Sequence, residues 1–144
     1  MRNFLIGLSI ATTIACHLAS VAAQPLVSPT ARFVFLQIGP DKKERLFIFE
    51  LTDPARLQEA RQIIGDPSNH KRHVQGKVVQ RQAAYNPSWS FHLDPATVTF
   101  FELQIEVCDA NVTYVQDHLD EVGGAFLPKS VWCPWTSTLT KELN

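Results

Sequence analysis

The sequence predicts an α+β fold, a two-layer sandwich in which an antiparallel sheet of about four strands carries two helices on one face. Alternating apolar residues mark several short strands, and apolar residues at helical spacing mark two helices. These segments follow the order strand-strand-helix-strand-strand-helix, which is typical of α+β domains. Two cysteines in the part expected to fold should form one disulfide.

The N-terminus has the pattern of a cleaved secretory signal. Arg2 supplies a positive charge, residues 4–15 are apolar, and Val21-Ala22-Ala23 offers the small residues that signal peptidase requires. The apolar run is shorter than the roughly 20 residues of a membrane-spanning helix. We therefore expect residues 1–23 to be removed and the protein to be secreted, with no membrane span.

The remaining chain is expected to be a flexible lead-in at residues 24–31 followed by one domain at residues 32–144. The formal net charge is −1 for the whole sequence, and it becomes −2 once Arg2 is lost. A charge this weak argues against nucleic acid or an anionic membrane as the main partner.

A hairpin and a helix are predicted first. Residues 32–38 and 44–51 alternate around aromatic and β-branched side chains, and the turn residues 39–43 join them. Asp53 and Pro54 then begin a helix, because an aspartate can accept hydrogen bonds from the free backbone N–H groups and a proline at the first position loses no bond. Gly65 is its expected end. Its apolar face comprises Leu57, Ala60, Ile63 and Ile64.

The next two strands differ in strength. Residues 74–81 predict a strand that Gly76 weakens. The clearest alternation in the chain follows between Thr97 and Cys108. One face of this long strand is expected to pack in the core and the other to be at least partly wet. The core face comprises Thr99, Phe101, Leu103, Ile105 and Val107, and the other comprises Phe100, Glu102, Gln104 and Glu106.

The second helix is predicted after Asp109 and ends at Gly123-Gly124. Its apolar positions are Val112, Val115, Leu119 and Val122. The ten residues after it can span at most about 33 Å, more than the roughly 20 Å length of the helix. The chain can therefore return and place Cys133 beside Cys108, which predicts the disulfide Cys108–Cys133.

Catalytic candidates are few. His92, with Asp94 or Glu102, is the best group for acid–base chemistry, but no nucleophile motif surrounds the neighbouring Ser90. Glu102 and Glu106 lie roughly 13 Å apart along the predicted strand, farther than a glycosidase pair. A hydrogen-bonded structural histidine is the favoured interpretation of His92.

No metal or other cofactor is expected. His70 and His73 flank two cations, which repel a divalent ion, and His118 lacks a second histidine one turn away.

Aromatic residues supply the candidate binding contacts, which are Trp89 and His92 in one segment and Trp132 and Trp135 in another. Tryptophans beside a disulfide more often pack in the core, so this alternative stays open. Asn111 begins the sequon Asn-Val-Thr and is a candidate glycosylation site or a helix cap.

Several strings resemble a secreted domain shared with the slime-mould cAMP-inducible, calmodulin-binding protein and many bacterial and fungal secreted proteins. The resemblance implies the identity of the domain but no catalytic residues. Calmodulin is not an expected partner, because an exported chain does not meet it and the helix after Asp109 is acidic rather than basic. The strings are residues 51–54, 85–95, 106–109, 117–128 and 132–135.

These features together predict a small secreted module, a non-enzyme rather than an enzyme, that binds an extracellular protein or carbohydrate as an effector or inhibitor would. One alternative is a small secreted hydrolase that uses His92 with Glu102 or Asp94. Another is a structural component of a wall or matrix.

Overall fold

The computed structural model describes residues 29–144. The expected signal peptide at residues 1–23 lies outside the described residues. The strands are β1 (Ala31–Ile38), β2 (Glu44–Leu51), β3 (His73–Val79), β4 (His92–Leu93), β5 (Thr99–Phe101), β6 (Val122–Gly123), β7 (Phe126–Pro128), β8 (Val131–Trp132) and β9 (Ser137–Leu143). The helices are α1 (Pro54–Gly65) and α2 (Val112–Asp117), with the 3-10 turns η1 (Glu106–Cys108) and η2 (Leu119–Glu121).

The strands form more than one sheet. In the first, β1 lies between β2 and β9 and pairs antiparallel with both. The second is built on β3, which pairs antiparallel with β4, β5 and β8. A short parallel pair, β6 and β7, completes the pairings among the described residues. Helices and antiparallel sheets therefore coexist, and the predicted α+β class is confirmed.

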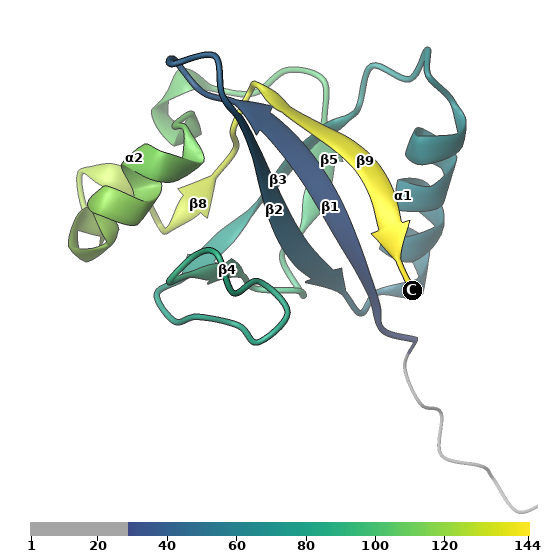
Figure 1. Cartoon of the computed structure of the whole chain (residues 1–144), viewed down its shortest axis with the longest axis horizontal. Helices are drawn as coiled ribbons and strands as arrows, with labels where there is room; N and C mark the ends of the chain where they lie inside the picture. The colour runs from purple at the N-terminus through teal and green to yellow at the C-terminus, as the bar shows by residue number, and fades with distance from the viewer. Residues whose placement is uncertain (1–28) are drawn as a thin grey trace, which may run out of the picture.

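An aromatic core joins the two larger sheets. Figure 1 shows β2, β1 and β9 crossing in front of β3 and β5. The ring of Trp132 from β8 lies 5.3 Å from that of Phe47 on β2 and 5.7 Å from that of Phe35 on β1. Phe91, just before β4, lies 5.2 Å from Phe47. Edge-on and tilted ring contacts of this kind stabilise a core beyond the area they bury.

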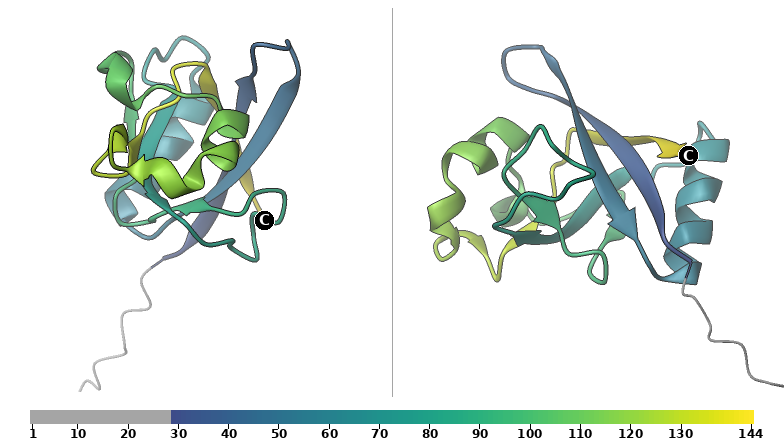
Figure 2. Two further views of the ribbon diagram at one scale, coloured as in Figure 1. Left: turned by 90° about the vertical axis from the view of Figure 1, so that its left-hand side faces the viewer. Right: turned by 60° about the horizontal axis from the view of Figure 1, so that its bottom comes forward.

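The two helices lie at opposite ends of the molecule (Figure 2). Helix α1 begins as predicted, because the Asp53 carboxylate accepts from the backbone N–H groups of Ala55 and Arg56. Its residues Leu57, Ala60 and Ile63 are buried in the same core as the sheets. A bidentate ion pair between Arg61 and Glu142 ties α1 to β9.

Two parts of the predicted architecture are wrong. The predicted single sheet of about four strands is replaced by several sheets, and the helices lie at the ends rather than together on one face. The main reason is β9, which lies in a segment that was predicted to be a tail. It pairs with β1, and its first residue accepts from the backbone N–H of Val74 on β3 through the Ser137 hydroxyl at 3.0 Å.

The long strand predicted from Thr97 to Cys108 is also wrong. Only β5 is strand, because Phe101 pairs with His73, the first residue of β3, and no residue of β3 remains to pair beyond it. The chain bends at Glu102 and enters η1. The second predicted helix is likewise shorter and ends at Asp117.

The predicted disulfide Cys108–Cys133 is confirmed. The backbone N–H of Cys133 also donates to the carbonyl of Cys108 at 2.8 Å, so main chain and side chain hold the two segments together. A small cluster packs on the disulfide, formed by Phe101 with the half-buried Val131 and Trp135.

Candidate functional site

The segment Tyr85–Leu93, here called the sealing segment, covers the free edge of β2. Edge strands expose unpaired backbone groups that other chains can pair with. The Trp89 indole donates to the carbonyl of Leu46 at 3.0 Å, and the Asn86 carboxamide accepts from the N–H of Ile48 at 3.1 Å. Trp89 is half-buried and packs on the core, so much of this candidate binding residue serves the fold.

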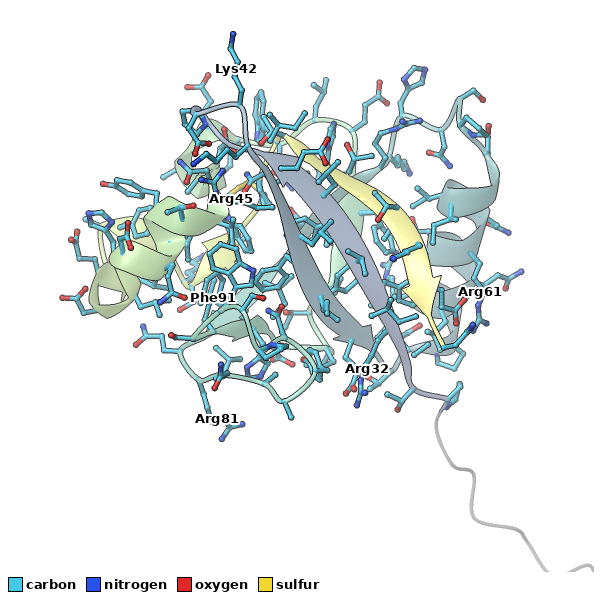
Figure 3. The ribbon with its side chains drawn as sticks, viewed as in Figure 1. Arg32, Lys42, Arg45, Arg61, Arg81 and Phe91 are labelled. Carbon is cyan, nitrogen blue, oxygen red and sulfur yellow. A yellow bond between two sulfur atoms is a disulfide. The ribbon has the colours of Figure 1, made fainter. Side chains whose placement is uncertain are left out.

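The rest of the sealing segment is also held by specific bonds. Ser90 receives the Gln116 side chain of α2, which accepts from its N–H at 2.8 Å and donates to its hydroxyl at 3.1 Å. Phe91 is fully buried and lies between β2 and β4 in Figure 3. Burial, followed by the Glu50 carboxylate, raises the pKa of Tyr85, and Arg32, whose guanidinium lies 5.1 Å from the ring centre, opposes that shift.

His92 is buried and its ring makes a main-chain contact. Its Nδ1 lies 2.6 Å from the carbonyl of Arg81, whose side chain projects into solvent (Figure 3). The Asp94 carboxylate, a candidate partner, accepts instead from the N–H of Ala96 at 3.1 Å within its own turn. The imidazole thus closes the base of a loop.

The structure does not bring His92 and Glu102 together. His92 pairs with Val79 at one end of β3. Phe101, which precedes Glu102, pairs with His73 at the other end. The stretch of β3 between these positions is roughly 20 Å long, too far for a shared proton.

The other two tryptophans occupy different environments. Trp132 is fully buried, and its indole donates to the carbonyl of Ala110 at 2.9 Å. Trp135 is half-buried on the disulfide, and its backbone N–H donates to the Asp109 carboxylate at 2.9 Å. Its indole N–H is buried without a partner among the described residues. Trp132 therefore offers no exposed ring face, and Trp135 offers part of one.

Asn111 caps α2. Its carbonyl oxygen accepts from the N–H of Tyr114 at 2.9 Å, and the buried Gln37 accepts from the N–H of Val112 beside it. A glycan is attached to the amide nitrogen of an asparagine, so the cap and the sugar do not compete. Asn111 also lines a hollow of about 440 Å³ whose wall includes Pro40.

An exposed apolar strip lies between β5 and the disulfide. It comprises Leu103, Ile105 and Val107, whose exposed fractions are 78%, 65% and 54%. The exposed carboxylates Glu102 and Glu106 alternate with them. The alternation in the sequence is real, but the side that was predicted to pack in the core faces solvent.

A hollow of about 310 Å³ adjoins the apolar strip. Ile105 and Val107 form one part of its lining, and Lys129 is the one charged residue in that lining. Lys129 and Ser130 have positive φ values of 59° and 61°, as does Leu127 at 47°. Such angles are strained for residues with a Cβ and persist where the surroundings enforce them.

The apolar strip is held from below by polar contacts. The Gln104 side chain donates to that of Gln75 on β3 at 2.8 Å and accepts from the N–H of Ile105 at 3.1 Å. Gln75 in turn donates to the Thr99 hydroxyl at 2.8 Å. The aliphatic side chains therefore project from a segment that is fixed at both ends.

The apolar strip was not predicted to be a surface. Its burial was inferred from alternation alone, although alternation does not say which face is covered. One signal was present: the strand predicted at residues 97–108 was longer than its predicted neighbour at residues 74–81, so its far end had nothing to pair with.

The described part of the chain has no helix long and apolar enough to cross a membrane. Within residues 29–144, His, Cys, Asp and Glu side chains form no group of three or more that could hold a metal ion.

Fold and disulfide together define an α+β protein in which two antiparallel sheets enclose an aromatic core. The family model for the N-terminal domain of the cAMP-inducible calmodulin-binding protein matches residues 29–144, and the chain belongs to this family. This match confirms the resemblance found in the sequence. No curated protein and no solved structure matches the chain.

Proposed function

We propose that the protein is a secreted, non-enzymatic module that binds an extracellular partner protein through the apolar strip. One observation carries the proposal: Leu103, Ile105 and Val107 expose more than half of their surface within a segment of the chain that is anchored at both ends. Contiguous exposed aliphatic side chains with a charged rim are typical of protein interaction sites. An oxidised disulfide and a leader-like N-terminus support export.

A test of this proposal uses the oxidised chain without residues 1–23 as bait against the extracellular fraction of its source. The variant Leu103→Ser/Ile105→Ser/Val107→Ser should lose saturable capture of the partner. A matched variant, Ile38→Ser/Leu46→Ser, alters two aliphatic residues on the outer face of β1 and β2 that are 51% and 55% exposed. This control should capture the partner as the unmodified chain does.

Other outcomes would replace the proposal. Equal capture by both variants would exclude the apolar strip as the binding site. Saturable binding to polysaccharide that does not depend on the strip would make the partner a carbohydrate. The absence of any saturable ligand would favour a structural component of a wall or matrix.

The hydrolase alternative has less support. It needs His92 beside Glu102 or Asp94, and these side chains are engaged elsewhere or lie at opposite ends of β3. His92→Ala is therefore expected to reduce stability while leaving partner capture by the folded fraction intact.

A further inference from the structure

We infer that the apolar strip takes an extended segment of its partner in which aliphatic and basic side chains alternate, paired through the main chain with Leu103 and its neighbours. This inference rests on the proposed function and adds the chemistry of the partner and its mode of binding. Strand addition to a free edge is a common way for one protein to recognise another.

The main chain leading into the strip has unpaired groups. Within residues 29–144, β5 pairs along one edge alone, with β3. The N–H of Val74 points away from β5, toward Ser137, so successive residues of the ladder alternate and the backbone groups of its ladder partner Phe100 face the free edge. Beyond the ladder, no backbone hydrogen bond from Leu103 or Gln104 occurs in the described chain.

The side chains of the strip alternate in charge and polarity. Glu102 and Glu106 are exposed and alternate with the aliphatic residues Leu103 and Ile105. Opposite charges on facing residues of two paired strands stabilise the pairing, and like charges oppose it. A partner strand with lysine or arginine facing the glutamates and aliphatic residues facing the strip satisfies both requirements.

A second copy of this chain fits poorly. Antiparallel self-pairing centred on Gln104 would place Glu102 opposite Glu106, and parallel pairing in register would place each glutamate opposite itself. Both arrangements set like charges side by side. The charge pattern therefore favours a basic partner over a homodimer.

The hollow beside Ile105 and Val107 offers an anchor point. Its lining includes the buried Cys108 and the half-buried Val131, so an aliphatic side chain of the partner would leave water there. The one cation in the lining, Lys129, disfavours a basic side chain inside the hollow. We therefore place the partner's aliphatic side chains over the hollow and its basic ones beside Glu102 and Glu106.

The test uses capped peptides as probes of the oxidised chain, followed by NMR of its backbone amides. A peptide of alternating lysine and valine should bind about tenfold more tightly than one of alternating glutamate and valine, and added salt should narrow the difference. The amide signals of residues 102–106 should move. Methylating the peptide nitrogens on one edge should weaken binding by about tenfold, since it removes the main-chain donors.

A charge-reversed variant sharpens the test. Glu102→Lys/Glu106→Lys should invert the preference between the two peptides. Glu44→Lys/Glu121→Lys makes the same change of charge at two other exposed glutamates and should leave the preference unchanged.

The inference and the proposed function can fail separately. Should the strip-dependent capture of a partner persist while neither peptide preference nor sensitivity to methylation is found, the inference is overturned and the binding module stands. Should the strip variant capture its partner normally, the proposed function fails first. Tight pairing of the chain with itself at residues 102–106 would also overturn the choice of a basic partner.

Discussion

The sealing segment and the apolar strip exchange the roles that their residues suggest. The sealing segment carries the tryptophan and histidine that look like binding contacts, yet its side chains bond to the main chain of β2 and of its own loop. The apolar strip has the regular alternation of a core strand, yet its three aliphatic residues lie in solvent.

This exchange shows that residue type is a weaker guide to function than the availability of partners. An indole or imidazole satisfied by a backbone carbonyl has little left to offer a ligand. An aliphatic side chain left without a covering strand or helix keeps its full tendency to bury itself. The experiments below measure how complete the exchange is.

The largest effect is expected at the centre of the sealing segment. Phe91→Ala should lower the free energy of unfolding by about 3–5 kcal/mol, because Phe91 is fully buried against Phe47 and Trp132. Leu103→Ala in the strip is the matched control and should change it by less than about 0.5 kcal/mol. Urea denaturation of both variants makes the comparison. Equal losses would place the strip in the core and end the contrast.

A smaller effect is expected from the edge cover. Asn86→Ala should cost about 2 kcal/mol, because the N–H of Ile48 and the carbonyl of Phe91 both lose their partner in a buried site. Ser88→Ala changes an exposed neighbour and should be nearly neutral. Hydrogen exchange should also accelerate at Ile48 in the Asn86 variant, and unchanged exchange would show that this edge of β2 is covered by other means.

The smallest effect, a gain, is expected beside the strip. Lys129→Gly should stabilise the protein by about 1 kcal/mol, because glycine adopts a φ of 59° without strain. Lys129→Ala keeps the Cβ and should gain nothing. If thermal denaturation ranks the two variants equally, the turn is not strained, and its positive φ values carry no sign of a functional constraint.

Local features of the fold were predictable because their causes are local. The hairpin of β1 and β2 follows from alternation, and α1 follows from its cap and apolar face. The bond between Cys108 and Cys133 follows from cysteine count and reach.

Features that depend on distant partners were not predictable in the same way. Strand β9 has only two leucines among polar residues, Leu139 and Leu143, and its place is set by β1, far away in sequence. The end of β5 is set by where β3 begins. Neither fact is present in the residues concerned, so the apolar strip emerged only when the strands were assembled.

The pairing of β1 with β9 has a consequence for how the chain folds. Arg32 and Leu143 are register partners, so the first sheet joins the earliest described strand to the last element along the chain. Closing so long a loop costs chain entropy before any contact repays it, which slows folding. Until β9 arrives, the hairpin of β1 and β2 keeps one edge open to pairing with other chains. A newly made molecule therefore stays vulnerable to misassembly until its final strand docks.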